Sequence, residues 1–438
     1  MDRLPTRQVE PLQSPPTGKK SKFPIKTAGI ALAIVLLIEL AGPQVLLQLS
    51  KPKPAPAQGS PAGLSYFPDS YEASRQRFIQ GKSTLKSYGS GIKLTSYPVG
   101  GENGLYIDAM KADATKTMQN LIILTSGMHG VEGYVGSAMI ELFRNEFMPK
   151  LDPTTTGVIW VHAANPWGMK HNHRYNEDHV DLNRNFFDQP DAYGKQQNPS
   201  YQVMRSFLEK PSPVGNAVNH EVAFFGDLIG EIIRHGTGTI SEALLQGQYE
   251  NPQGVYYGGA KAERSTQILQ HIYEEALNSG YARIVHVDLH TGYGPRDQMS
   301  IFSASKETMT EEQASQAFQY PLVLTPTSKD YYATSGDNTE YFYTLKQRLQ
   351  SSADLYSTTF EFGTMGVDTW GSVRSLRNTI DENSLYANGS TSPITEQIIL
   401  NRYKEMFDPS DAEWRLKAVA DFRQAMSGVL KYKGMLAK

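Results

Sequence analysis

The chain has 438 residues, 39% of them hydrophobic and 20% charged, so it is long enough to form one large core or two smaller ones. Its formal net charge of -3 offers no basic field for nucleic acid, and we expect no nucleic-acid partner. The sequence contains no cysteine, which excludes disulfides, thiolate metal ligands and a cysteine nucleophile. Any metal must therefore be bound by histidine and carboxylate side chains.

The first fifty residues differ in composition from the rest. Residues 1–26 are polar, proline-rich and basic, and we expect them to form a cytoplasmic tail. Residues 27–49 are mostly apolar and have the length of a transmembrane segment or signal anchor, although they include Glu39 and Pro43. The basic flank predicts a membrane-anchored protein with everything after residue 50 outside the cytoplasm. Signal cleavage, which would give a secreted protein, explains the same pattern and is the alternative.

The rest of the chain divides into a linker and one large domain. Residues 50–65 are rich in proline, alanine and glycine, which is typical of an extended linker. Residues 66–438 show no internal repeat, and short β-branched runs alternate in them with longer helical patterns. That alternation predicts a single α/β domain with a mixed, mostly parallel, twisted sheet flanked by helices. We expect strands over 120–125, 157–162, 284–290, 299–303 and 358–362, and helices over 135–147, 216–234, 261–279, 372–386, 394–407 and 411–430.

The first predicted strand of this domain runs into a glycine-rich turn that carries His129 and Glu132. A His and a Glu three residues apart on such a turn can both face one metal ion at the edge of the sheet. The glycines allow the backbone to turn tightly. Taken alone the spacing is a weak signal, because a capping glutamate beside a surface histidine has the same pattern.

Two arginines follow the second predicted strand, in a segment that contains Arg174 and the run Asp181-Leu-Asn183-Arg184-Asn-Phe. Arginine binds carboxylates through two parallel hydrogen bonds. Two arginines near a metal can therefore divide the work of holding a substrate carboxylate and polarising a carbonyl. As isolated residues they would instead form surface ion pairs.

The third predicted strand ends in His286-Val-Asp288-Leu-His290-Thr-Gly. Side chains alternate along a strand, so the two histidines and the aspartate share one face. His290 lies where the loop begins, and as a third ligand it would complete a set of two His and one Glu that leaves a zinc position open for water. Either Asp288 or His286 is a candidate to orient a metal ligand.

The last predicted strand, Thr358-Thr-Phe-Glu361-Phe, places one carboxylate in an apolar frame that ends in glycines. Burial raises the pKa of a carboxyl group towards neutral pH. A carboxylate with such a pKa can take a proton and return it in one reaction cycle, so Glu361 is a candidate general base.

Four motifs occur along the chain in the order His129-x-x-Glu132, Asp181-Leu-Asn-Arg-Asn-Phe, His290, Thr-Phe-Glu361-Phe. This order resembles the zinc carboxypeptidase superfamily, which includes carboxypeptidase A and the aspartoacylase and succinylglutamate desuccinylase branch. The residues within and around these motifs resemble those of an uncharacterised bacterial family within this superfamily. The resemblance covers about residues 120–366 and implies a zinc-carboxypeptidase-like catalytic domain over 66–438.

The resemblance implies how the metal would be bound and used. His129, Glu132 and His290 would bind one zinc ion, and Asp181 would accept a hydrogen bond from His129. Glu361 would take the proton from zinc-bound water as it attacks the scissile carbonyl, and would then pass it to the leaving amine. Two imidazoles with one carboxylate also suit cobalt or iron.

The resemblance also implies how a substrate would be held. Asn183 and Arg184 would bind its terminal carboxylate, and Arg174 would stabilise the oxyanion. Tyr332, within Tyr-Ala-Thr-Ser-Gly, resembles the mobile tyrosine that closes over the substrate of carboxypeptidases.

These roles predict a zinc-dependent hydrolase of amide bonds, and specifically a metallocarboxypeptidase that acts on peptides. Arg174 precedes Asn183 by nine positions, which is closer to the deacylase branch, whereas the Tyr332 motif favours the carboxypeptidases. An N-acyl amino acid deacylase with the same zinc site is therefore the alternative. The sequence does not predict the oligomeric state.

Two non-enzymatic interpretations are weaker. A tethered binding protein that has lost catalysis is disfavoured, because every expected ligand and the base occur together. A structural or storage metal site at His171, His173 and His179 is disfavoured, because no tight pattern of carboxylates accompanies these histidines.

Overall fold

The computed structural model describes residues 25–53, 62–328 and 334–436. Within them, eight strands form one mixed sheet in the order β1-β2-β4-β3-β5-β8-β6-β7. Strands β4, β3, β5 and β8 run parallel at its centre, whereas β1, β2 and β6 pair in antiparallel fashion. The strands are β1 (Ile92–Pro98), β2 (Tyr106–Ala112), β3 (Asn120–Ser126), β4 (Thr156–His162), β5 (Arg283–Gly292), β6 (Met299–Ser303), β7 (Val323–Leu324) and β8 (Asp354–Gly363).

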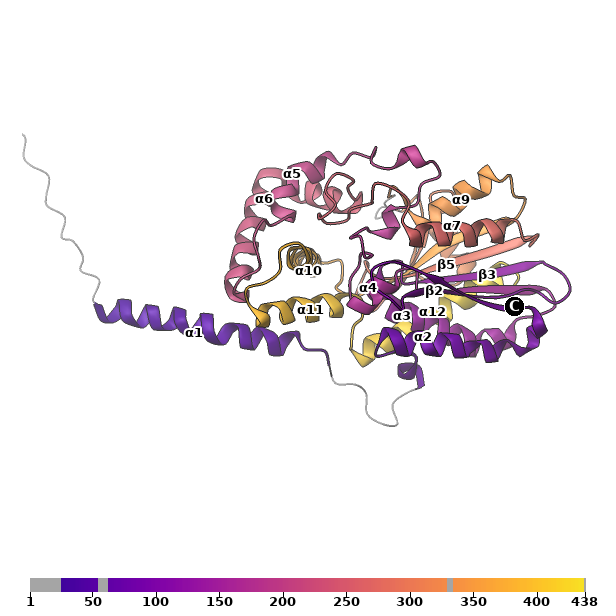
Figure 1. Cartoon of the computed structure of the whole chain (residues 1–438), viewed down its shortest axis with the longest axis horizontal. Helices are drawn as coiled ribbons and strands as arrows, with labels where there is room; N and C mark the ends of the chain where they lie inside the picture. Colours follow the sequence, from indigo (N-terminus) through magenta and orange to yellow (C-terminus); the bar gives the residue numbers. More distant parts are fainter. Residues whose placement is uncertain (1–24, 54–61, 329–333, 437–438) are drawn as a thin grey trace, which may run out of the picture.

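Helices cover both faces of the sheet, as Figure 1 shows. This arrangement confirms the predicted single α/β domain with a mixed sheet between helices. The helices are α1 (Ile25–Ser50), α2 (Tyr71–Gln80), α3 (Gly133–Glu146), α4 (Pro166–His171), α5 (Pro199–Leu208), α6 (Ala217–Leu245), α7 (Arg264–Leu277), α8 (Glu311–Phe318), α9 (Asn338–Arg348), α10 (Thr369–Asn388), α11 (Pro393–Phe407) and α12 (Ala412–Tyr432).

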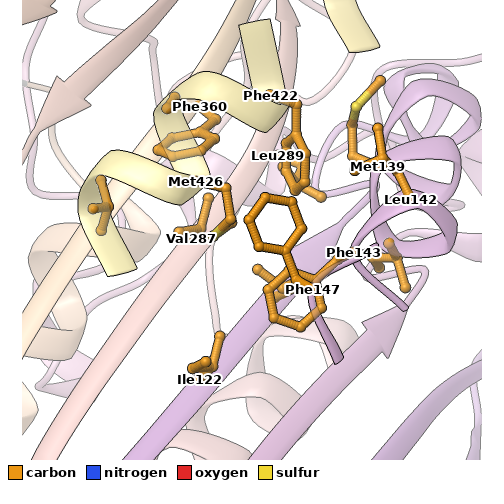
Figure 2. Packing of buried hydrophobic residues seen from close by; sticks show 14 of the residues in the cluster. Ile122, Met139, Leu142, Phe143, Phe147, Val287, Leu289, Phe360, Phe422 and Met426 are labelled. Carbon is orange, nitrogen blue, oxygen red and sulfur yellow. The ribbon is translucent and has the colours of Figure 1, made fainter. Parts of the chain in front are cut away.

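The core lies on the two faces of the central strands, whose side chains are buried on both sides. Ile122 and Val287 face one side, where they pack with Phe143 of α3 and Phe422 of α12 (Figure 2). Their neighbours on the same strands, such as Ile123, face the other side and pack with α7 and α9. Full burial of a large apolar side chain contributes about 1.5–3 kcal/mol to the stability of the folded state. Packing on both faces therefore stabilises the parallel centre of the sheet.

Helix α1 contains the segment for which a membrane-spanning helix is predicted. It carries Glu39 and has Pro43 in its interior, and its second half packs against α6 and α11. No helix in the described ranges of the chain combines the length and the apolar character that crossing a membrane requires. The membrane helix predicted over 27–49 is therefore not supported, although a helix does form there.

The topology brings the predicted metal ligands and the predicted base to one edge of the sheet. Strands β3, β5 and β8 are parallel neighbours, so their carboxyl ends lie side by side. His129 follows β3, and His290 and Glu361 lie near the ends of β5 and β8. In open parallel sheets, this edge is where ligands bind.

Candidate metal centre

The turn after β3 carries the first two candidate ligands. His129 has extended backbone angles, Gly130–Glu132 form a single 3-10 turn, and α3 begins at Gly133. A Cβ atom at Gly130 would lie 2.1 Å from the backbone carbonyl carbon of Gly168, so only glycine fits without a backbone shift. The close approach of this turn to Gly168 holds His129 and Glu132 at the edge of the sheet.

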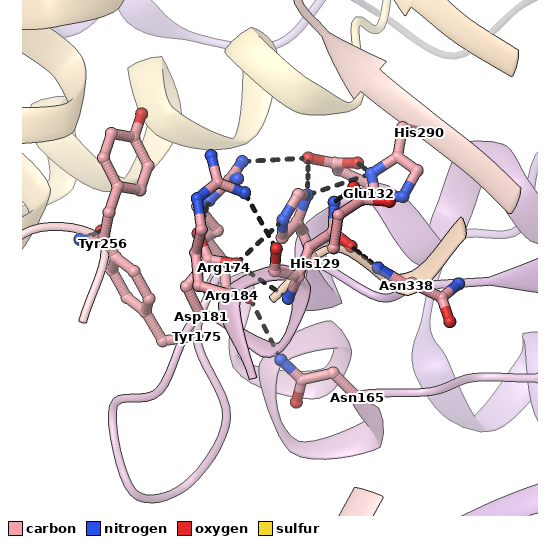
Figure 3. Close-up of polar contacts among 12 residues, drawn as sticks. His129, Glu132, Asn165, Arg174, Tyr175, Asp181, Arg184, Tyr256, His290 and Asn338 are labelled. Atoms are coloured by element: carbon pink, nitrogen blue, oxygen red, sulfur yellow. Dashed lines mark hydrogen bonds and ion pairs between the residues drawn. The ribbon is translucent and has the colours of Figure 1, made fainter. Parts of the chain in front are cut away.

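Three side chains converge at this edge and are all buried (Figure 3). Nδ1 of His129 lies 2.8 Å from Oε1 of Glu132. Nδ1 of His290 lies 3.1 Å from Nδ1 of His129 and 3.1 Å from Oε2 of Glu132. In the described residues, this is the one group of three or more His, Asp or Glu side chains close enough to share a metal ion, and the loop with His171, His173 and His179 forms none.

An aspartate holds each histidine ring by its other nitrogen. Nε2 of His129 lies 3.1 Å from Asp181, and Nε2 of His290 lies 2.8 Å from Asp288. A carboxylate accepts a hydrogen bond from the N–H of the ring nitrogen that it faces, so the Nδ1 lone pairs are left to face the common point. Two imidazoles and one carboxylate presented in this way fit the donor set of a zinc site.

Asp288 rather than His286 contacts the ligand on β5. Its carboxylate also accepts a hydrogen bond from Nδ2 of Asn338 at 2.9 Å. Burial opposes the charge of Asp288, but His290 outweighs it and holds the pKa of the aspartate well below its ordinary value. His286 instead interacts with the hydroxyl groups of Thr125 and Ser357.

The guanidinium group of Arg174 lies beside the three ligands. Its Nε donates to Asp181 at 2.9 Å, and its Nη1 lies 3.5 Å from Oε1 of Glu132. The ring of Tyr256 lies 4.9 Å below the guanidinium carbon. Burial opposes the charge of Arg174, but Asp181 and Glu132 outweigh it, and its pKa is raised well above the ordinary value. Arg174 therefore stays charged beside the metal centre.

Glu361 lies next to His290 across the β5–β8 pair, where the two residues are direct partners in the parallel register. Its Oε1 accepts a hydrogen bond from the backbone N–H of Tyr293 at 2.9 Å. Burial raises the pKa of Glu361 to about 8, and the nearby Glu132 carboxylate adds to the rise. A carboxyl group with such a pKa exchanges its proton near neutral pH.

The model of the family described as "Protein of unknown function (DUF2817)" matches residues 67–421. The chain belongs to this family. No curated protein matches the sequence. The match includes the ligand-bearing turn, β5 and β8, so all three candidate ligands lie within the family's domain.

Three solved structures illustrate what the chain is similar to. Bovine thrombin-activatable fibrinolysis inhibitor is 12% identical, with 76% of this chain and 96% of that chain covered and a TM-score of 0.39. Carboxypeptidase A from Helicoverpa armigera is 16% identical, with coverages of 80% and 81% and a TM-score of 0.41. Succinylglutamate desuccinylase from Chromobacterium violaceum is 15% identical, with coverages of 70% and 73% and a TM-score of 0.32. At these identities and TM-scores, residue roles do not transfer from them.

The residues for which a substrate role is predicted are placed differently from the ligands. The amide of Asn183 donates to Asp337 at 3.0 Å and accepts from the backbone N–H of Asn338 at 2.9 Å. The guanidinium of Arg184 is buried and donates to the backbone carbonyls of Asn183 and Leu245. Both side chains thus have internal partners. Tyr332 lies outside the described residues.

Two residues contact the metal centre although no sequence motif predicts their contacts. The backbone N–H of Thr291 donates to Oε2 of Glu132 at 2.9 Å, and Asn338 donates to Asp288. Thr291 follows a predicted ligand directly, but its contact is made by the backbone, which any residue except proline provides. Asn338 lies at the start of α9 and meets Asp288 only through the fold.

Proposed function

We propose that the chain is a zinc-dependent hydrolase of amide bonds, and specifically a metallocarboxypeptidase that acts on peptides. The convergence of the ligand atoms of His129, Glu132 and His290, with Glu361 beside them, is the observation that supports this proposal. Zinc, when bound, supplies a Lewis acid that polarises a carbonyl group and increases the acidity of water.

Glu361 performs the proton transfers of this reaction. Its raised pKa allows it to remove a proton from the attacking water and to give that proton to the leaving amine. The hydrogen bond from the N–H of Tyr293 fixes one carboxylate oxygen, which leaves the other for water. Because Glu361 lies next to His290, these proton transfers occur beside the three metal ligands.

Arg174 stabilises the oxyanion that forms from the scissile carbonyl. Its positive charge lies in a buried environment, where a fixed charge acts strongly on developing charge. Nε and Nη1 contact Asp181 and Glu132, which orient the guanidinium and leave Nη2 for a substrate oxygen.

An N-acyl amino acid deacylase is the second candidate. It would use the same ligands and the same base, and the nine-residue spacing between Arg174 and Asn183 resembles the deacylase branch.

The two candidates are separated by assaying the purified, zinc-loaded chain on two substrate sets. One set is N-blocked dipeptides with a free carboxyl terminus, with the matching dipeptide amides as the control. The other set is N-acyl amino acids. A carboxypeptidase releases the terminal amino acid from the free dipeptides and much more slowly from the amides. Hydrolysis of acyl amino acids alone establishes the deacylase, and no zinc-dependent hydrolysis in either set refutes both.

A further inference from the structure

Helix α6 exposes an apolar face at one end of the molecule. Val222, Ile229 and Ile233 are 69%, 58% and 78% exposed, and their spacing of seven and four residues places them on one side of the helix. Residues of α6 on the opposite side, such as Phe224 and Leu228, are buried in the domain. The helix is therefore apolar on both its inner and its outer side.

An aromatic pair widens this surface. Phe225 stacks on Trp370, at the start of α10, with ring centroids 6.0 Å apart and planes 3° from parallel. Trp370 is 58% exposed. Phe225 lies between Val222 and Ile229 in the helical repeat, so the aromatic pair continues the same surface. We call Val222, Phe225, Ile229, Ile233 and Trp370 the α6 face.

The charged residues of α6 near this face have partners. Asp227 pairs with Lys210 at 2.9 Å, and Glu231 pairs with Arg234 at 2.7 Å. Paired charges cost less to bring towards a medium of low dielectric constant than single charges do. The charges at its border therefore do not prevent the α6 face from leaving water.

The α6 face continues into the N-terminal helix. Gly42 of α1 packs against Val218, which lies one turn before Val222, and Asn216 donates to the backbone carbonyl of Glu39 at 3.0 Å. In Figure 1 the first half of α1 runs past α6 and away from the domain. Residues 27–38 of the chain carry no charge. The α6 face thus adjoins a helix whose N-terminal half includes this uncharged run and projects from the domain.

We propose that the α6 face docks on the surface of a lipid bilayer, beside α1. An apolar helix face with a half-exposed tryptophan suits the boundary between headgroups and acyl chains, which takes up apolar side chains without a matching partner surface. Six Lys and Arg side chains within residues 1–26 directly precede the uncharged run and match anionic headgroups. The docking does not depend on the proposed hydrolase activity.

Vesicle flotation of the full chain tests the docking. The vesicles contain phosphatidylcholine with or without phosphatidylglycerol, and the test variant is Ile229→Glu with Ile233→Glu. We expect its partition onto the mixed vesicles to fall by about tenfold or more, because two apolar side chains become charged. Met118→Glu is the matched control, because Met118 is an exposed apolar residue outside the α6 face. Unchanged partition of the double variant refutes the proposal.

Quenching of Trp370 fluorescence by brominated phosphatidylcholine tests whether the α6 face itself enters the bilayer, independently of α1. Trp160 and Trp414 are buried, and a Trp370→Phe variant provides the background. Quenching of Trp370 in the unmodified chain, and its loss in the double variant, support the proposal. Flotation without quenching refutes it. A second outcome also refutes it. Light scattering would show that the unmodified chain is a dimer and the double variant a monomer, and neither would bind vesicles. The α6 face would then contact a second copy of the chain.

Discussion

Each imidazole of the metal centre is held at one nitrogen and presented at the other. Asp181 and Asp288 accept from the Nε2 atoms, and the Nδ1 atoms point at the position that a cation would take. Both aspartates are themselves fixed, Asp181 by Arg174 and Asp288 by Asn338. These contacts hold the ligands in one orientation, which lowers the cost of binding a cation.

Replacing Asp288 with Asn should weaken metal binding. The amide lacks the charge that polarises His290, and we expect zinc affinity to fall by about 10–100-fold. Competition with a chelating dye measures this affinity. Asp354→Asn, at the exposed start of β8, is the control and should bind zinc as the unmodified chain does. Equal affinities in the two variants would contradict the role of Asp288.

Glu361→Gln should retain zinc and lose turnover. Glutamine has nearly the same shape but cannot take a proton, so kcat should fall by about 10²–10⁴-fold, the usual contribution of a general base. Metal analysis of the purified variant checks that the ligand set is intact. Turnover close to that of the unmodified chain would remove Glu361 from the proposed reaction.

At the residue scale, a site residue can be predicted from a local motif when it lies close in the sequence to the end of a predicted strand. His129, Glu132, His290 and Glu361 all have this position, and the structure brings them together. The environments of Asn183 and Arg184 could not be predicted in the same way. Their partners include Asp337 and Leu245, which are distant in the chain and are brought close only by the fold.

At the scale of elements, the turn between β3 and α3 depends on a close backbone contact. It passes so near to Gly168 that any side chain at Gly130 must displace the main chain. Gly127, just before it, has a φ of 68°, which favours glycine. The glycines of this turn therefore determine where its two ligands lie.

Gly130→Ala should disturb both stability and metal binding. A methyl group forced into a packed site costs about 1–3 kcal/mol, and here the contact is with backbone that cannot rotate away. Urea denaturation measures the free energy of unfolding, and dye competition measures zinc affinity. Gly215→Ala is the matched control, because a Cβ there meets no atom within 4 Å. Identical results for the two variants would show that the turn tolerates a side chain.

The elements that sequence predicts are those with strong apolar patterns. All five predicted strands are present, as β3, β4, β5, β6 and β8. Strands β1 and β2 could not be predicted. Strand β1 is a half-exposed edge strand with the polar sequence Ile-Lys-Leu-Thr-Ser-Tyr-Pro, and β2 pairs with it. Strand β7 has only two residues. The central strands can thus be predicted from their apolar sequences, whereas the edge strands form through pairing with their neighbours.

At the scale of the whole molecule, the metal centre joins segments that are far apart in the chain. His129 and Glu132 lie in the turn between β3 and α3, and His290 lies on β5. Glu132 also accepts from Thr291, whose hydroxyl group donates to the carbonyl of Phe407 at the end of α11. A bound cation would therefore connect β5 to the turn before α3 and, through Thr291, to α11.

Removal of zinc should lower the melting temperature of the domain. Zinc at a thousandfold excess over its dissociation constant stabilises the folded state by about 4 kcal/mol if it does not bind the unfolded chain. Calorimetry before and after chelation measures the shift. The Glu361→Gln variant should show the same shift, since it retains the ligands, whereas His290→Ala should show little. A melting temperature that is insensitive to chelation would contradict a zinc site that joins these segments.

The direct pairing of His290 with Glu361 across β5 and β8 has a consequence for folding. A slip of β8 by a single residue would preserve much of the hydrogen bonding between the strands, yet it would turn Glu361 to the opposite side of the sheet. A chain misaligned in this way would be compact and inert. During refolding, the first appearance of turnover would therefore mark the moment at which these two strands reach their final alignment.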